Sequence, residues 1–282
     1  MSGPAGGSRR KGNKMYSEQD VRKWLTDSSG FYTISVLEEC DSTNNRIMES
    51  AREGAREGTV ILADIQTGGK GRRGRSFFSP SGCGIYISIL LRPQLEAFDT
   101  TQITLSAAVA VARAVESACA LSPGIKWVND LYYRDRKVCG ILAEGMTASA
   151  GKIDAVVLGI GINVFLPGDG FPKEISNKAG ALMNRKPDAD SDRLRAKIAG
   201  MLLESFYQIY RELPDRSFLE EYRSRSFLTG RTVLVDPEGA AYPAVVKGID
   251  EEGRLAVIKM DGTEQKLFAG EVSLELHPGE NG

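Results

Sequence analysis

Histidine and paired cysteines are nearly missing from this chain of 282 residues. The single histidine is His277, and the four cysteines, Cys40, Cys83, Cys119 and Cys139, form no CxxC pair. A structural zinc site needs about four Cys or His ligands in short pairs, and Ser–His–Asp or Cys–His catalysis needs a histidine beside the nucleophile. The sequence therefore argues against both. The cysteines fit reduced, mostly buried side chains of a cytoplasmic protein.

A long apolar run, a signal peptide and an excess of charge are missing as well. No apolar stretch reaches the length of a membrane span. The chain has 36 Lys and Arg against 37 Asp and Glu, so its net charge of −1 gives no general attraction to nucleic acid or anionic membranes. Any basic site must be local. The composition, 41% hydrophobic and 26% charged, is that of a globular protein.

Local patterns divide the chain into three predicted parts. Residues 1–14 contain Gly, Ser and basic residues without apolar periodicity, which predicts a flexible leader. Residues 15–229 mix strands and helices without regular alternation, which favours an α+β domain around a central sheet over a Rossmann fold. Residues 230–282 predict a small β-barrel, because short apolar runs alternate with turn signals at 237–239, 252–253 and 261–262.

Apolar spacing predicts the elements of the middle part. Ser17 and Asp20 have the spacing of a capping box at the start of the first helix. The helix at 101–120 is apolar almost all round, as expected of a central buried helix. Helices are expected at 17–25, 42–51, 101–120, 192–213 and 218–227, and strands at 33–37, 59–65, 84–91, 125–128, 137–144 and 153–164.

The most informative segment is the loop QTGGKGRRGR at 66–75, between two expected strands. Its glycines allow the backbone to approach a ligand closely, and its cations offer donors to phosphate or carboxylate. The pattern is not the GxxxxGK[ST] of a P-loop. Repulsion among the cations predicts that an anionic ligand orders the loop. A solvated basic turn or an RNA-binding patch is the alternative.

Three further segments are weak signals when taken singly. Asn129 and Asp130 at a strand end could contribute to a site or simply make a turn. Lys137 opens an otherwise apolar strand, where a lone cation is unusual without an anionic partner. Gly159 and Gly161 lie inside a strand, which indicates a bulge or a close approach by a ligand or by backbone.

Taken together, five segments closely resemble the bacterial biotin–protein ligases in order and spacing. The resemblance covers roughly residues 38–276. It implies a central mixed sheet with helices on one side, of the class II aminoacyl-tRNA synthetase and biotin ligase type, and an SH3-like C-terminal barrel. The segments are DSTN at 41–44, the loop at 66–75, KWVND at 126–130, KVCGI at 137–141 and GIGIN at 159–163.

The resemblance also implies an activity and a set of site residues. Biotin and Mg·ATP would give biotinyl-5′-AMP, and the biotin would then pass to a lysine of a biotin carboxyl carrier protein. Lys137, Arg72 and Asp130 would be catalytic, with Asp130 also orienting Mg²⁺. The biotin site would comprise Ser42, Thr43, Asn44, Gln66, Lys70, Gly71, Arg72 and Lys137, and the ATP site Arg72, Arg75, Phe77, Asn129 and Asn163.

The chain departs from the family pattern at three positions. Lys70 stands where Arg is usual, which replaces a flat bidentate group by a point charge. Val128 stands in place of Pro, which should loosen that turn slightly. Phe77 stands in place of Trp but keeps an aromatic ring that can stack on adenine.

Two other functions fit parts of the pattern. A lipoate or octanoyl ligase would share the fold, but the RRxSGGG-type run of the lipoate ligases is absent from the sequence. A non-catalytic biotin sensor or nucleic-acid binder would use only the basic loop. About 40 residues precede Asp41, which leaves room for one short helix and no recognition helix. The expectation is therefore a ligase without DNA binding or repressor activity, either monomeric or homodimeric.

Overall fold

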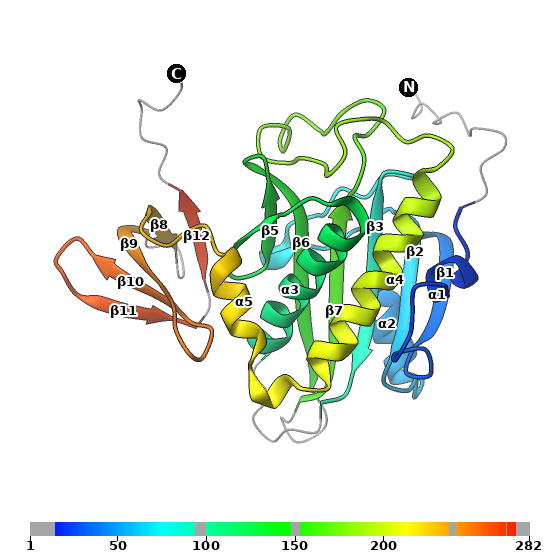
Figure 1. Ribbon diagram of the computed structural model, residues 1–282, viewed down its shortest axis with the longest axis horizontal. Helices are drawn as coiled ribbons and strands as arrows, with labels where there is room; N and C mark the ends of the chain where they lie inside the picture. The colour runs from blue at the N-terminus through cyan, green and yellow to red at the C-terminus, as the bar shows by residue number, and fades with distance from the viewer. Residues whose placement is uncertain (1–14, 94–99, 148–152, 237–240, 269, 275–282) are drawn as a thin grey trace.

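A computed structural model describes residues 15–93, 100–147, 153–236, 241–268 and 270–274. It contains a central seven-stranded sheet and a five-stranded antiparallel sheet near the C-terminus (Figure 1). The predicted leader at 1–14, the turn signal at 237–239 and the residues after 274 lie outside the described residues.

The central sheet is mixed, as predicted. Its strand order is β1-β2-β3-β7-β6-β5-β4, in which β1 and β2 pair in parallel and every other neighbouring pair is antiparallel. The irregular order of strands and helices along the sequence is therefore that of an α+β fold and not of a Rossmann fold. The strands are β1 Thr33–Cys40, β2 Thr59–Gln66, β3 Gly84–Leu91, β4 Gly124–Lys126, β5 Asp130–Tyr133, β6 Arg136–Thr147 and β7 Ile153–Asn163.

Several predicted elements differ from the structure by a few residues at their ends, and two of the differences have a clear cause. Strand β5 was not expected, because Asn and Asp at 129–130 resemble a turn; pairing with β4 on one side and β6 on the other makes it a strand. The fourth helix ends at Tyr210 rather than at 213, since Pro214 opens a short 3₁₀ turn there. The helices are α1 Glu18–Arg22, α2 Thr43–Arg52, α3 Thr100–Cys119, α4 Ser191–Tyr210 and α5 Phe218–Arg225.

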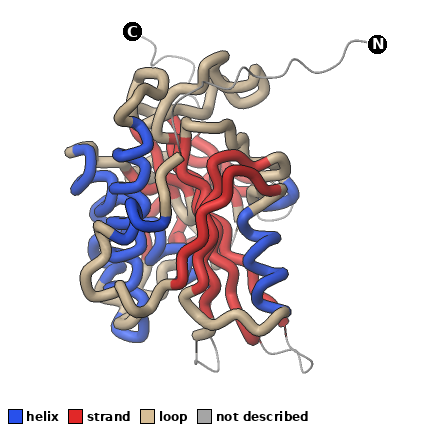
Figure 2. The backbone as a smooth tube through the Cα atoms, turned by 90° about the vertical axis from the view of Figure 1, so that its right-hand side faces the viewer, coloured by secondary structure: helices blue, strands red, loops and turns tan. Residues whose placement is uncertain are grey.

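Helices cover both faces of the central sheet. Ile87 of β3 belongs to the larger core, which includes α3 and α4, whereas Leu90 of β3 joins Ile47 of α2 in a smaller core. Among the described helices α2 therefore lies alone on its face (Figure 2). The expectation of helices on one side is wrong for α2, because its stripe of Ile47 and Ala51 needs the second face to be buried.

The C-terminal part is a separate antiparallel sheet in the order β11-β10-β9-β8-β12. The predicted turns at 252–253 and 261–262 join its hairpins, and both Gly253 and Gly262 have positive φ. Left-handed backbone favours glycine. The strands are β8 Thr232–Asp236, β9 Tyr242–Ile249, β10 Leu255–Lys259, β11 Glu264–Leu267 and β12 Glu271–Leu274.

The turn at 250–254 docks this sheet on the larger part of the molecule. The indole Nε1 of Trp127 donates to the carbonyl oxygen of Gly253 at 3.0 Å, and Nε2 of Gln102 donates to that of Glu252 at 2.7 Å. The guanidinium of Arg223 donates to two carbonyl oxygens, of residues 249 and 250, at 2.9 and 2.7 Å. Backbone carbonyls at the turn thus meet donors from three separate elements.

Replacing Gly253 by Ala should weaken this docking. A Cβ there would lie 2.3 Å from Cδ1 of the buried Leu105. Gly262→Ala is the matched control, because Gly262 has a similar φ of 84° against 80° but nothing within 4 Å of its Cβ position. We expect Gly253→Ala to lower the free energy of unfolding by about 1–3 kcal/mol more than the control, measured by urea denaturation. Equal losses of stability in the two variants would show that backbone strain at positive φ, and not the contact with Leu105, dominates.

Candidate active site

The α2 face of the central sheet carries a patch made of glycines. Gly140 of β6 lies opposite Gly161 of β7, and Gly159 lies two residues before Gly161 in β7. A Cβ at Gly161 would lie 2.5 Å from Cε1 of Phe77, and one at Gly159 would lie 2.1 Å from Oδ1 of Asn44. Glycine at these positions lets side chains lie directly on the sheet. The sequence indicated a bulge or a close approach by a ligand or by backbone; the pairing of β7 is regular through 159–161, and it is side chains that approach.

The first turn of α2 places polar groups over this glycine patch. Ser42 is the N-cap of α2, and Ser42, Thr43 and Asn44 are all buried. The backbone N–H of Thr43 donates to Oε1 of Gln66 at 2.8 Å, which ties the start of α2 to the end of β2. Four of the eight residues predicted to form the biotin site, Ser42, Thr43, Asn44 and Gln66, are therefore neighbours in space.

Buried hydrogen bonds surround the amide of Asn44. Its Nδ2 donates to a carboxylate oxygen of Glu144 at 2.6 Å, and its Oδ1 accepts from the hydroxyl of Ser88 at 2.6 Å. The hydroxyl oxygens of Ser88 and Thr43 lie 2.7 Å apart. Neither Ser88 nor Glu144 was singled out from the sequence. The available signal was the single serine in the otherwise apolar strand GIYISILL at 84–91.

Backbone and side-chain hydrogen bonds hold both ends of the basic loop at 66–75. Nε2 of Gln66 donates to Oγ of Ser79 at 2.9 Å, and the N–H of Phe77 donates to the carbonyl oxygen of Gly69 at 2.8 Å. A Cβ on Gly69 would lie 2.5 Å from the carbonyl oxygen of Phe77. Within the loop, the N–H of Gly71 donates to the carbonyl oxygen of Arg75 at 2.7 Å.

The cations of the loop differ in exposure and in their contacts. Lys70, Arg73 and Arg75 are exposed, whereas Arg72 is half-buried and its Nη1 donates to Oδ1 of Asn129 at 2.9 Å. The amide Nδ2 of Asn129 in turn donates to the carbonyl oxygen of residue 141 at 2.9 Å. Arg73 lies in left-handed backbone, with φ of 55°. The arrangement links the loop to the segment at 126–130, two motifs predicted to share a site.

Lys137 has the anionic partner that its place in an apolar strand predicted. Its Nζ lies 2.6 Å from Oδ1 of Asp130, on the neighbouring strand β5. The ammonium also lies over the glycine patch, since a Cβ on Gly140 would be 3.4 Å from both Nζ of Lys137 and Cε2 of Phe77. One cation, one carboxylate and one aromatic ring therefore meet at the edge of the patch.

Asn163 occupies the end of β7, two residues beyond Gly161 on the same face. Its Nδ2 donates to the carbonyl oxygen of Gly180, and its own carbonyl oxygen accepts from the N–H of Leu182, both at 3.0 Å. Asn163 thus fixes the segment at 180–182 beside the site. The structure brings the predicted residues to one region, from α2 at one side to Asn163 and Asp130 at the other.

The cysteines take no part in this chemistry. All four are free, and Cys40, Cys83 and Cys139 are buried, which agrees with the sequence analysis. Burial and the nearby carboxylate of Asp130 raise the pKa of the Cys139 thiol, although Lys137 opposes this shift. Burial raises the pKa of Cys40 to about 11. Both side chains therefore remain neutral thiols near pH 7 and are poor nucleophiles.

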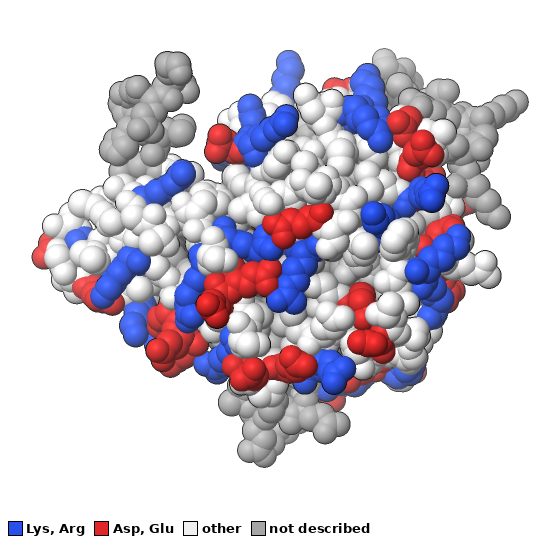
Figure 3. Space-filling view, in the orientation of Figure 1, with Lys and Arg blue, Asp and Glu red and all other residues white. Residues whose placement is uncertain are grey.

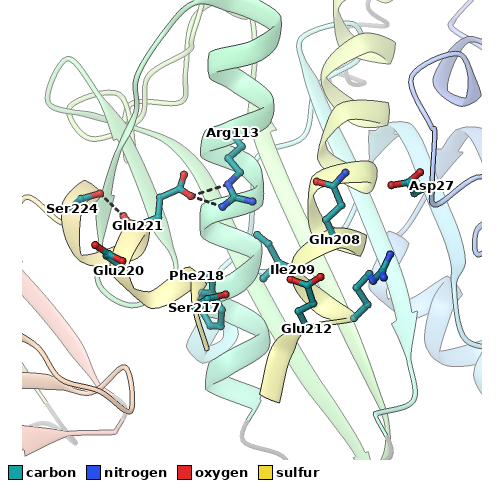
Figure 4. Close-up of a pocket in the computed structure, with 11 residues that line it drawn as sticks. Asp27, Arg113, Gln208, Ile209, Glu212, Ser217, Phe218, Glu220, Glu221 and Ser224 are labelled. Carbon is teal, nitrogen blue, oxygen red and sulfur yellow. Dashed lines mark hydrogen bonds and ion pairs between the residues drawn. The ribbon is translucent and has the colours of Figure 1, made fainter. Parts of the chain in front are cut away.

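A polar cleft of about 730 Å³ lies elsewhere, on the face covered by α3, α4 and α5 (Figure 4). In this cleft, Nη2 of Arg113 lies 2.6 Å from one carboxylate oxygen of Glu221, and the other oxygen of Glu221 lies 2.8 Å from Nη2 of Arg225. Acidic and basic side chains are interspersed over this whole face (Figure 3). The glycine patch is the better candidate site, because the cations of the basic loop and of Lys137 gather on one side of it.

Known proteins share both the sequence and the fold. The family described as biotin/lipoate A/B protein ligases matches residues 36–163. The bifunctional ligase/repressor BirA of Bacillus spizizenii is 32% identical over 94% of this chain and 83% of that protein. The biotin–[acetyl-CoA-carboxylase] ligase of Mycobacterium tuberculosis is 30% identical over 90% of this chain and 94% of its own length. This chain belongs to the biotin protein ligase family.

A solved biotin protein ligase has the same architecture. The enzyme of Aquifex aeolicus, in complex with biotin and ATP, superposes with a TM-score of 0.69 at 29% identity, covering 86% of this chain and 99% of that one. In the part of this ligase-family chain that the structure describes, no helix is long and apolar enough to cross a membrane. The family resemblance drawn from the five sequence segments is thus confirmed.

Proposed function

We propose that the protein is an ATP-dependent biotin–protein ligase that joins biotin to a lysine of a biotin carboxyl carrier protein. Family membership supports the ligase activity, and the Aquifex relative binds both biotin and ATP. The observation that carries the proposal is the meeting of the basic loop with Lys137 and Asn129 beside a glycine patch bordered by Thr43, Asn44 and Gln66.

In the first half-reaction, a carboxylate oxygen of biotin attacks the α-phosphorus of ATP. A new P–O bond forms, the bond to the β-phosphate oxygen breaks, and pyrophosphate leaves. The barrier is repulsion between two anions and the charge that grows on the phosphate oxygens. Positioned cations lower it by electrostatic stabilisation. Lys137 would contact both reacting groups, while Lys70, Gly71 and Arg72 would fold over them and Arg75, Phe77, Asn129 and Asn163 would hold the nucleotide.

In the second half-reaction, the neutral amine of the acceptor lysine attacks the carbonyl carbon of biotinyl-5′-AMP. The C–O bond to the phosphate breaks, AMP leaves with the electron pair, and the amine loses a proton. The cations that assist the first step also stabilise the leaving phosphate in the second. One site thus serves both steps.

Mg²⁺ would enter as the Mg·ATP substrate complex. In the described parts of the chain, no three His, Cys, Asp or Glu side chains converge as a metal site. This fits an ion held mainly by phosphate oxygens and water, with at most one or two protein carboxylates. Asp130, which pairs with Lys137 at the edge of the glycine patch, can supply one. When bound, Mg²⁺ would neutralise phosphate charge.

The direct test combines the purified protein with biotin, Mg·ATP and a biotin carboxyl carrier domain. We expect biotin-dependent pyrophosphate release and biotin on the acceptor lysine, with no transfer to a carrier whose lysine is replaced by Arg. Lipoate or octanoate in place of biotin separates the proposal from the ligases of similar fold. Activity with lipoate alone, or binding of biotin without pyrophosphate release, would overturn it.

Ligand should also protect the basic loop from trypsin. Lys70, Arg73 and Arg75 are exposed cleavage sites in the free loop. If cleavage requires the open loop, biotin plus a non-hydrolysable ATP analogue at ten times its Kd should slow it about tenfold. Cleavage after the exposed Arg216, between α4 and α5, is the internal control. Equal slowing at both sites, or none at the loop, would show that the ligand does not order it.

A further inference from the structure

We infer that Ser88 and Glu144 are positioning residues that make the predicted biotin site, at Thr43 and Asn44, selective for a cyclic urea. The inference rests on the proposed function, because it concerns how that site recognises the ring of biotin. Ser88 lies in β3 and is fully buried, and Glu144 lies in β6. Both approach Asn44 from the sheet, on opposite sides of its amide.

The hydrogen bonds fix which way the Asn44 amide faces. A carboxylate oxygen only accepts, so the group 2.6 Å from Glu144 must be the NH₂ of Asn44. Its Oδ1 therefore faces Ser88, and because that oxygen cannot donate, the single hydroxyl hydrogen of Ser88 points to it. One N–H of Asn44 is then left to donate to a ligand.

The same constraint fixes the polarity of Thr43. Its Oγ1 lies 2.7 Å from Oγ of Ser88 and 3.1 Å from Oε1 of Gln66. Because the hydrogen of Ser88 is engaged by Asn44, the hydroxyl of Thr43 can donate its hydrogen either to Oγ of Ser88 or to Oε1 of Gln66. In both cases the hydrogen of Thr43 is used within the protein. Toward a ligand, the oxygen of Thr43 can therefore act only as an acceptor.

The predicted biotin site thus presents an acceptor from Thr43 beside a donor from Asn44. A cyclic urea is the complement, since it carries N–H donors next to a carbonyl acceptor. A dithiolane ring, as in lipoate, or a plain alkyl chain offers neither group and would leave both protein groups unpaired after burial. Unpaired buried polar groups are the strongest basis for rejecting an analogue.

The chain of hydrogen bonds extends to the basic loop. Gln66 accepts from the backbone N–H of Thr43 and donates to Oγ of Ser79, and that hydroxyl donates to the carbonyl oxygen of Phe77. The residues that recognise the ring are therefore connected to the segment that leads out of the loop. Ser88 lies at the centre of this network.

Replacing Ser88 by Ala should raise KM for biotin about tenfold, the cost of about one hydrogen bond, and leave KM for ATP within about twofold. Ser106→Ala is the matched control: Ser106 is equally buried, in α3, and donates only to its own helix, to the carbonyl oxygen of Ile103. The control should lower stability similarly but leave both KM values unchanged.

Glu144 provides a second test that does not disturb the core, because its side chain is half-buried. Glu144→Ala removes the acceptor that holds Asn44 and should raise KM for biotin. Glu144→Gln keeps a carbonyl oxygen and should restore most of the affinity. Activity with lipoate should stay undetectable in the wild type and rise, relative to biotin, in Ser88→Ala.

The outcomes separate the inference from the proposed function. A wild-type protein that adenylates biotin, together with Ser88→Ala and Glu144→Ala variants whose KM for biotin is unchanged, would overturn the inference alone. Equal loss in kcat with all substrates and no shift in KM would do the same, since that is the result of a merely structural role. A wild-type protein without biotin-dependent pyrophosphate release would overturn the proposed function.

Discussion

Replacement of Lys137 by Ala should reduce biotinyl-AMP formation by about 10³-fold while the protein remains folded. Loss of one preorganised donor at a developing oxyanion costs about 10²–10³ in kcat, and here the lost donor carries a full charge. The change also removes the ammonium that lies 2.6 Å from Oδ1 of Asp130, so that this carboxylate loses its cationic partner. Biotin-dependent pyrophosphate release measures the first half-reaction directly.

Two variants sharpen this test. Lys23→Ala is the matched control, because Nζ of Lys23 also lies 2.6 Å from a carboxylate oxygen, that of Asp20, but at the N-terminal helix α1. It should leave turnover unchanged. The double variant Lys137→Ala with Asp130→Asn also removes the carboxylate proposed to orient Mg²⁺, so its turnover should be no higher than that of Lys137→Ala. Turnover near the wild-type rate in Lys137→Ala would refute the catalytic role.

The sequence was sufficient for features that depend on neighbouring residues. Strand β3 was predicted at 84–91 and has those bounds, because its apolar run is closed by a glycine at the start and a proline soon after its end. The capping box of Ser17 and Asp20 is present as predicted. The anionic partner of Lys137 also followed from local chemistry, since an ammonium on an apolar strand needs one.

Features that depend on strand register could not be predicted in the same way. The glycine patch exists because Gly140 lies opposite Gly161, a pairing between β6 and β7 that no local pattern specifies. The register between β3 and β7 places Ser88 opposite Gly159 and so brings its hydroxyl to Asn44. A single serine in an apolar strand signals a buried polar contact, but the partner is set by tertiary structure.

Contacts between distant segments were likewise beyond the sequence. Trp127 was interpreted as a plausible core residue, and it is buried, yet its indole N–H also binds the C-terminal sheet at Gly253. Arg73 of the basic loop lies 3.9 Å from Oδ2 of Asp236 at the end of β8. The C-terminal sheet therefore contacts two of the sequence motifs, the segment at 126–130 and the basic loop. These contacts agree with a supporting role of this sheet at the site.

Replacement of Arg72 by Gly should let biotinyl-AMP escape before transfer. The hydrogen bond from Nη1 of Arg72 to Oδ1 of Asn129, at 2.9 Å, joins the basic loop to the other side of the site. A hydrogen bond to a charged group contributes about 1.5–3 kcal/mol, so its loss should speed release of the adenylate about 10–100-fold. Chase of preformed biotinyl-AMP with unlabelled compound measures this rate, and biotin on lysines of unrelated proteins reports the escape.

The double variant with Asn129→Ala decides whether Arg72 acts through this contact. If the loop is held by the Arg72–Asn129 pair, the second change should add little to the first, because interaction energies of contacting residues are not additive. Arg72→Ala separates the lost side chain from the added backbone freedom of glycine. Arg73→Ala removes the neighbouring cation, which points to Asp236 instead, and should affect release less. Fully additive effects of Arg72→Gly and Asn129→Ala would mean that the two residues hold the adenylate independently, and that the loop is closed by the ligand alone.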